Sequence, residues 1–121
     1  MPNLRGWQVE GGLSAAGSLL AWVAAEAGHP LDRLVAEAAE APAGSYGVMV
    51  LPWLHGARAP WWRDDAELTI VGRTPDTPPA ALARAAFEGV AYEVASILDL
   101  LEPARPADPA RDAELWALLQ R

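Results

Sequence analysis

The order of elements in residues 48–89 constrains the fold of this chain more than any other feature. Residues 48–51, VMVL, are a short apolar run closed by a proline, which is typical of a buried strand. Residues 53–67 form a long loop rich in tryptophan and charge, and residues 68–71, LTIV, indicate a second short strand. Thr77 followed by two prolines then predicts a capped helix start. This order predicts an α/β domain with a long helix after two short strands.

The helix that begins after Thr77 is predicted to run to about Glu102 and to carry one apolar stripe. A helix of this kind needs other elements to cover that stripe. Nine apolar or small residues recur along it at three- and four-residue steps: Leu82, Ala85, Ala86, Gly89, Val90, Val94, Ile97, Leu98 and Leu101.

Two further helices are expected before the strands. Residues 14–27 are rich in Ala, Leu and Trp, and Gly28 followed by Pro30 gives a stop signal. Gly17 lies in the first turns of this segment, where a helix-interior glycine costs about 1 kcal/mol relative to alanine. Such a glycine indicates close packing or the close approach of a ligand. The second helix is expected at residues 31–40, with one apolar face formed by Leu31, Leu34, Val35 and Ala38.

The C-terminal part of the chain reads as a Pro-rich linker, residues 103–110, followed by a short terminal helix at residues 111–120. The apolar residues of that helix are Leu115, Trp116, Leu118 and Leu119. Residues 1–121 are taken as a single domain, because a chain of this length supports one hydrophobic core.

Composition excludes several classes of function. The net charge is −7, from 16 acidic and 9 basic residues, which argues against nucleic-acid and membrane-surface partners. The chain has no cysteine, which excludes disulfides, thiol nucleophiles and Cys-ligated zinc. No apolar segment is long enough to span a membrane and no signal peptide is visible, so a cytoplasmic location is expected.

Four blocks of the sequence together resemble the C-terminal domain of the FGGY carbohydrate kinases. They are EGGLSAAGSLLAW (10–22), LPWLHGARAPWWRDDAELTIVG (51–72), ALARAAFEGVAYEV (81–94) and RDAELWALLQ (111–120). The two middle blocks, with their spacing, are fairly specific, and the outer two are weak alone. The resemblance covers nearly the whole chain.

The resemblance implies a partial ribonuclease H-like, actin-like ATPase domain, with helices packed on a small, incomplete sheet. Such kinases use ATP and Mg²⁺ to phosphorylate an alcohol group of a sugar or polyol. The family's helix glycine near the nucleotide phosphates matches Gly17, and a nucleotide-contacting position one turn later matches Ala21. The family's Gly-Glu-Arg loop matches Gly56, Ala57 and Arg58, so Gly56 and Arg58 are expected in a loop beside the cleft.

The sequence also departs from the family's pattern. It contains no Asp-x-Gly and no Gly-Thr-Ser, the two phosphate motifs, and the family's catalytic aspartate belongs to sequence upstream. Asp108 and Pro109 stand where the adenosine-binding glycines would precede the last block. No catalytic or metal-ligating residue is therefore expected here, and the chain alone is expected to be inactive. A truncated gene product, a fragment and a decayed copy all fit this pattern.

Each site residue also has a plainer interpretation. Gly17 could serve helix–helix packing, and Arg58 could form a surface ion pair with Asp64, Asp65 or Glu67. The Asp64–Asp65 pair is read as a solvated loop rather than a Mg²⁺ site. Three aromatic residues of the loop are expected to anchor it to its own domain rather than to stack on a ligand: Trp53, Trp61 and Trp62.

Two residues of the long helix are expected to be structural. Glu88 is expected to make a helix-capping or loop-tethering hydrogen bond rather than to act as a general base. Gly89 is expected to pack against the sheet.

The alternative function is a non-catalytic interaction module. An incomplete sheet leaves edges and apolar faces that need cover. That cover could come from a second copy of the chain or from a separately encoded N-terminal half.

Overall fold

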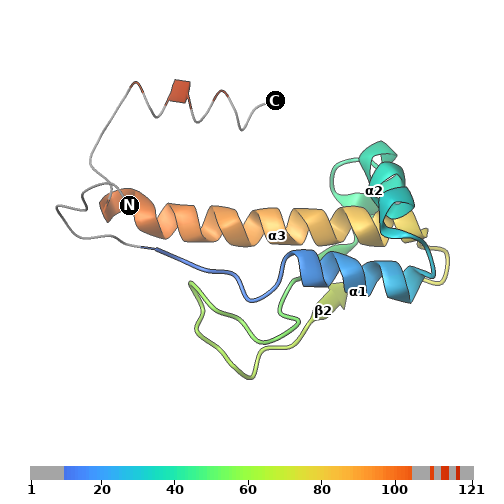
Figure 1. The fold of residues 1–121 in the computed structure, drawn as a ribbon, viewed down its shortest axis with the longest axis horizontal. Coiled ribbons are helices and arrows are strands. Elements are labelled where there is room, and N and C mark those ends of the chain that lie inside the picture. The colour runs from blue at the N-terminus through green and yellow to red at the C-terminus, as the bar shows by residue number, and fades with distance from the viewer. Residues whose placement is uncertain (1–9, 105–109, 111–112, 115–116, 118–121) are drawn as a thin grey trace.

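The computed structural model describes residues 10–104, 110, 113–114 and 117. Figure 1 shows α3 as the long axis of the molecule, with α1 on one side and α2 above one end. None of the helices in the described ranges is long and apolar enough to cross a membrane. In chain order the elements are α1 (Gly17–Ala27), α2 (Leu31–Glu40), the 3₁₀ helix η1 (Ser45–Gly47), β1 (Met49–Leu51), β2 (Thr69–Val71), α3 (Pro79–Leu101) and the 3₁₀ helix η2 (Glu102–Ala104).

The core lies where α1, α2 and β1 meet the N-terminal part of α3. Small residues on α3 allow the other elements to approach closely, while larger side chains from those elements fill the space between them. The core side chains include Leu19 and Val23 of α1, Leu34 and Ala38 of α2, Val50 of β1, and Leu82, Ala85 and Ala86 of α3.

Gly89 allows α3 to lie directly against β1. A Cβ atom at this position would lie 2.2 Å from the carbonyl oxygen of Val50, so no larger residue fits without backbone movement. The prediction that Gly89 packs against the sheet is confirmed.

The two strands form an antiparallel hairpin, in which Val50 pairs with Ile70. Val50 faces the core, whereas Met49 beside it is exposed. Both strands lie where the sequence predicted them, shortened by one residue each at the N-terminal end. The predicted small sheet with packed helices is confirmed for the described residues.

The helix starts differ in detail from the prediction. Helix α1 begins at Gly17 and not at Ser14, because the Ser14 hydroxyl donates to the Gly56 carbonyl oxygen and lies in the entry segment. Gly17 is therefore the first helical residue, and the cost of an interior glycine does not apply. Thr77 does not cap α3: its Oγ1 accepts a hydrogen bond from the Thr74 N–H at 2.8 Å, and Pro78 occupies the cap position.

The nine residues predicted to form one apolar stripe spread over more than half of the circumference of α3, so the prediction of a single stripe is wrong. Gly89 and Ile97 are buried, but Val94 and Leu98 are exposed. The predicted terminal helix lies largely outside the described residues. The residues of this segment that the structure describes have helical backbone: Ala110, Ala113, Glu114 and Ala117.

Candidate functional site

The N-terminus of α1 is open to solvent at Gly17. A Cβ atom placed on Gly17 would meet nothing within 4 Å, and the residue is exposed. Helix–helix packing therefore does not account for this glycine in the described part of the chain. No side chain caps the helix, whose preceding residue is Ala16. The first N–H groups of an α-helix have no intrahelical partner, so these donors are available to an acceptor from outside.

Ala21 lies one turn further along the same face of α1 as Gly17 and is also exposed. Ala25 continues this row of small exposed residues by another turn. The face is therefore shallow and uncharged, and it could accommodate a ligand close to the helix backbone.

The loop that carries Gly56 and Arg58 is tied to the segment that enters α1. The Ser14 hydroxyl donates to the Gly56 carbonyl oxygen, which joins residues 42 positions apart. Gly56 has φ +78°, a backbone conformation that favours glycine. A Cβ at this position would also lie 3.1 Å from the Asp64 carbonyl oxygen, which leaves little space for a side chain. The structure thus brings the loop and the start of α1 together, as a shared site would require.

Arg58 is exposed and its Cζ lies 4.0 Å from the position of a Cβ on Gly12. Within the described ranges Arg58 forms no ion pair. The expected pairing with the acidic residues of the loop is wrong, since Arg63 takes that role, with Nη2 2.6 Å from Asp65 Oδ2. That hydrogen bond lowers the pKa of Asp65. Arg58 is left as a cation near the entry to α1.

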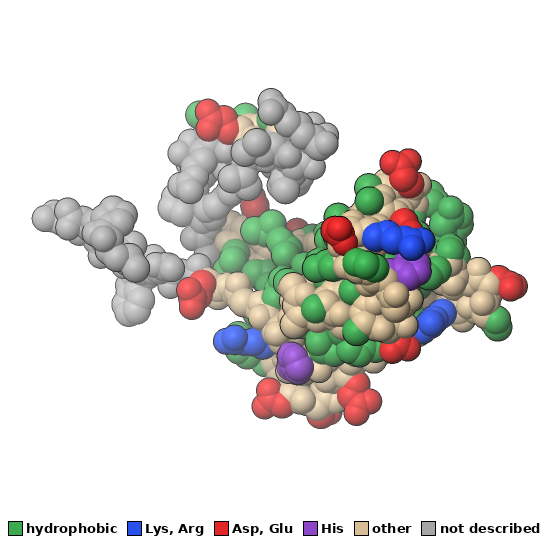
Figure 2. All heavy atoms as spheres, turned by 45° about the vertical axis from the view of Figure 1, so that its right-hand side comes forward, with side chains coloured by type: hydrophobic (Ala, Val, Ile, Leu, Met, Phe, Trp, Pro, Cys, Tyr) green, Lys and Arg blue, Asp and Glu red, His purple; other side chains and the backbone are tan. Residues whose placement is uncertain are grey.

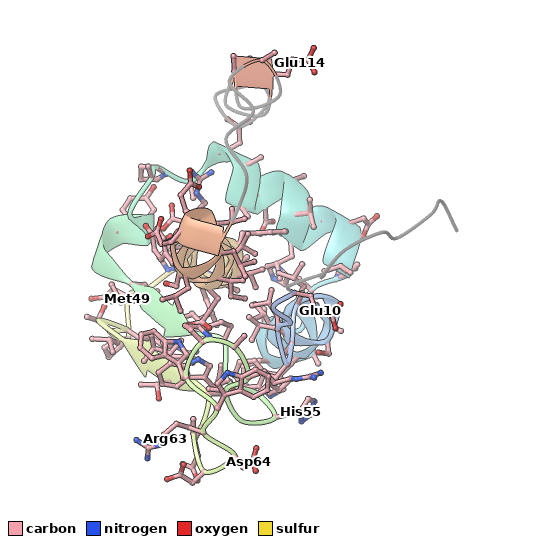
Figure 3. All side chains as sticks on the ribbon, turned by 90° about the vertical axis from the view of Figure 1, so that its left-hand side faces the viewer. Glu10, Met49, His55, Arg63, Asp64 and Glu114 are labelled. Carbon is pink, nitrogen blue, oxygen red and sulfur yellow. The ribbon has the colours of Figure 1, made fainter. Side chains whose placement is uncertain are left out.

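Arg63 and Asp64 lie at the tip of the loop, away from the core, as Figure 3 shows. His55 lies in the same loop, on its α1 side. The two sides of the loop are joined by hydrogen bonds between the backbones of Ala57 and Arg63 in both directions, at 2.8 and 2.9 Å. The loop is therefore closed on itself by an isolated antiparallel bridge.

The tryptophans of the loop differ in their roles. Trp61 Nε1 donates to Glu93 Oε1 of α3 at 3.1 Å, which confirms for Trp61 that the ring anchors the loop to its own domain. Trp62 is 68% exposed and makes no such contact with another described side chain. Trp53 and Trp61 line a cavity of 250 Å³ together with Arg63, and the Trp53 Nε1 atom is buried without a partner among the described residues.

Glu88 braces the turn that leads into β1. It accepts hydrogen bonds from the Gly44 N–H at 3.0 Å, the Ser45 hydroxyl at 3.0 Å and Arg84 Nε at 2.9 Å. Burial alone would raise the pKa of Glu88, but these donors, with Arg84 first among them, lower it below its ordinary value. The prediction of a loop-tethering hydrogen bond is confirmed.

The turn held by Glu88 contains four consecutive residues with positive φ, from Gly44 to Gly47. The two that are not glycine are Ser45 at +50° and Tyr46 at +54°. Ser45 is fully buried, and sequence reasoning missed it. The only local signal was the pair of glycines, Gly44 and Gly47, on either side of Ser45 and Tyr46.

The described residues offer donors to an anion at the start of α1 and no cluster of metal ligands. No group of three or more His, Asp or Glu side chains in the described ranges could hold a metal ion. On the face drawn in Figure 2, charged side chains are scattered among hydrophobic ones and do not form one patch. The free N–H donors at Gly17, next to a shallow surface, suit an anionic phosphate group.

Comparison with known proteins shows which family the chain resembles in sequence and fold. Residues 2–111 match the C-terminal domain of the FGGY family of carbohydrate kinases. The chain is 33% identical over 96 residues to an apulose kinase of Pectobacterium atrosepticum, a match that covers 79% of this chain and 19% of the kinase. The chain therefore belongs to the FGGY family of carbohydrate kinases, and the resemblance in the sequence is confirmed.

Solved structures agree with this assignment. The gluconate kinase from Lactobacillus acidophilus has a TM-score of 0.69 and 29% identity, over 75% of this chain and 19% of that chain. Plasmodium falciparum glycerol kinase with ADP has a TM-score of 0.64 and 29% identity, over 74% of this chain and 18% of that chain. The chain spans about a fifth of the length of the relatives that it matches. Its fold is accordingly part of an actin-like ATPase domain.

Proposed function

We propose that this chain forms the nucleotide-side wall of an ATP-dependent kinase that phosphorylates an alcohol group of a sugar or polyol. The observation that carries the proposal is the open N-terminus of α1, where Gly17 is exposed and no side chain caps the helix. Membership of the family supports it, as does the relative that was solved with ADP.

In this proposal the N–H groups of the first turn of α1 bind the phosphate oxygens of ATP. The positive end of the helix dipole favours the anion, and the missing Cβ of Gly17 lets it approach the backbone. Ala21 contacts the nucleotide one turn later by shape alone, because its side chain offers no hydrogen bond. Arg58 adds a cation from the loop that Gly56 and Ser14 hold against the entry to α1.

Phosphoryl transfer also needs a group to accept the proton of the attacking hydroxyl and a cation to neutralise the phosphates. Among the described residues no acidic cluster fits Mg²⁺. We therefore expect that the chain positions the nucleotide and that catalysis requires the remainder of a kinase. The chain alone should show no turnover with ATP, Mg²⁺ and a panel of sugars and polyols.

The test is a titration of ATP against the purified chain, followed by amide NMR. We expect shifts confined to α1 and to the loop with Gly56 and Arg58. The variant Ala21→Glu should abolish them, because it places a negative charge beside the phosphates on an exposed position. Ala25→Glu is the matched control, since it adds the same charge on the same exposed face one turn further from the helix start.

Two results would contradict the proposal. One is a folded chain without shifts at millimolar ATP. The other is an equal loss of binding in Ala21→Glu and Ala25→Glu, which would indicate general charge repulsion rather than a site at the N-terminus of α1.

A non-catalytic interaction module is the second candidate function. The observation that favours it is the group of exposed side chains on the sheet side, where Met49 and Tyr92 line a cavity of 130 Å³ beside β1. A free strand edge next to apolar side chains could pair with a second copy or with an N-terminal half encoded separately. Sedimentation over a wide concentration range tests the first of these, because a chain that stays monomeric throughout does not pair with itself.

A further inference from the structure

Helix α3 carries a second apolar stripe on the side away from the sheet. Its members follow one another at steps of four, three, four and three residues, which is the spacing of a helix–helix seam. They are Phe87, Ala91, Val94, Leu98 and Leu101. With about 100° of rotation per residue, Leu98 lies about 180° around the helix from Gly89, which faces the sheet.

Helix α2 covers only the N-terminal part of this stripe. Val35 and Ala38 of α2 form a groove of 360 Å³ with Phe87 and Ala91 of α3. Beyond the groove the stripe continues without cover from another described element, and Val94 is 40% exposed and Leu98 44% exposed. An element that covered them would extend the packing that α2 begins.

We propose that residues 111–119 of the same chain dock on this uncovered part of α3. On a helix, Leu115, Trp116 and Leu119 share one face. The described residues Ala113, Glu114 and Ala117 belong to the opposite face, have helical backbone and are exposed. The segment thus has one apolar face to bury, and its other face is suited to solvent.

The length of the connection sets the register of the proposed contact. The last turn after α3 ends at Ala104, and helical backbone resumes at Ala110, which leaves five residues between them. Helix–helix connections of about two to eight residues join antiparallel neighbours. Counting outward from the middle of this connection places Leu98 opposite Trp116 and next to Leu115, and Val94 opposite Gln120 and next to Leu119.

The described C-terminal residues already lie on the required side. Figure 3 labels Glu114, which lies on the same side of α3 as α2 and away from the sheet. The docking therefore needs no passage around α3.

The tether favours this occupant over a second copy of the chain. A short linker holds the terminal segment near α3 at an effective concentration in about the millimolar range, which exceeds the concentration of free chains in an ordinary solution. A second copy would have to displace a segment that is always present. The surface is therefore assigned to the chain's own C-terminus.

Cross-linking tests the contact directly, because the chain has no cysteine. The double variant Leu98→Cys with Leu115→Cys should form an intramolecular link on mild oxidation or with a short bismaleimide. The matched control pairs Leu98→Cys with Glu114→Cys, one residue away but on the opposite face. We expect the first pair to link at least about tenfold faster than the control.

Linked dimers in place of linked monomers would assign the surface to a second copy and overturn the proposal. Equal rates for the two double variants would also overturn it, because they would reflect proximity in sequence alone. Leu98 is exposed, so its replacement should not unfold the core, and circular dichroism checks this.

Hydrogen exchange on the unmodified chain provides a second measurement that needs no cysteine. Amides between Ala113 and Leu119 should exchange slowly, and Leu98→Glu should raise their exchange rates at least about tenfold while the amides of α1 stay protected. Fast exchange of these amides in the unmodified chain would overturn the proposal.

Discussion

Replacing Gly89 by alanine tests whether α3 is held against β1 as closely as the structure shows. The new Cβ would lie 2.2 Å from the Val50 carbonyl oxygen, whereas real Cβ atoms are essentially never closer than 3.0 Å to such an atom. The helix and the strand would have to separate by at least 0.8 Å, the difference between these distances. The obstacle is a backbone atom, so no side-chain rotation can relieve the contact.

Two opposing terms set the size of the effect. Overpacking in a well-packed core typically costs about 1–3 kcal/mol. The change from glycine to alanine inside a helix returns about 1 kcal/mol through helix propensity. The difference between the two terms is a net loss of about 0–2 kcal/mol in the free energy of unfolding. We expect about 1–2 kcal/mol, because β1 must move and its pairing with β2 must adjust.

Urea unfolding followed by circular dichroism measures this loss. A chain of this size has a slope of about 1–3 kcal/mol per molar urea, so the midpoint should fall by about 0.5–1 M. Ala95→Gly is the control for propensity, because Ala95 is an exposed residue of α3 and its replacement should cost about 1 kcal/mol by that term alone. If Gly89→Ala unfolds at or above the midpoint of the parent chain, the close approach of α3 and β1 is refuted.

Two further predictions concern the hydrogen bonds that hold the loops. The pKa of Glu88 is lowered in the folded state, so the stability it contributes is present above the pKa of an unfolded glutamate, about 4.3, and is lost as the pH falls through the lower folded value. Glu88→Gln should therefore reduce the difference between the urea midpoints measured at pH 6 and pH 3. An unchanged difference would show that the Glu88 carboxylate does not stabilise the turn before β1. Trp61→Phe should destabilise the chain by about 1–3 kcal/mol, because Glu93, which is 7% exposed, loses the hydrogen bond that the Trp61 indole donates. Trp62→Phe should leave the thermal midpoint nearly unchanged, and equal effects of the two substitutions would rule out a special role for the Trp61–Glu93 bond.

Elements whose signals are local could be predicted from the sequence. Helix α2 has the bounds that its apolar spacing predicted, and β1 and β2 match their apolar runs within one residue. Gly89 could be predicted because a glycine in the middle of a strongly periodic helix needs a packing partner. In each case the information lies within a few residues of the element itself.

Contacts between distant residues could not be predicted in the same way. The choice between Arg58 and Arg63 as partner of Asp65 depends on the turn made by the loop. That turn depends on Gly56 and on the bridge between Ala57 and Arg63. Periodicity could not identify the exposed apolar face of α3 either. It reports which residues are apolar, whereas exposure depends on which other elements are present to cover them.

Three side-chain hydrogen bonds connect the candidate site to the frame of the molecule. Ser14 joins the entry of α1 to the loop, Trp61 joins the loop to Glu93 of α3, and Glu88 of α3 holds the turn before β1. The loop and the N-terminus of α1 are thus positioned by α3, and the proposed nucleotide face is formed by residues of this chain.

The proposed docking of the C-terminus uses the opposite side of the same helix. Figure 3 shows α1 on the sheet side of α3 and Glu114 on the α2 side. A charge at Ala21 should therefore weaken ATP binding without changing the cross-link between positions 98 and 115, and Leu98→Glu should release the C-terminus without changing the NMR shifts at Gly17. Because each variant acts on one side of α3, failure of either proposal leaves the other intact. A variant on one side that altered both measurements would instead show that α3 transmits a change across its own width.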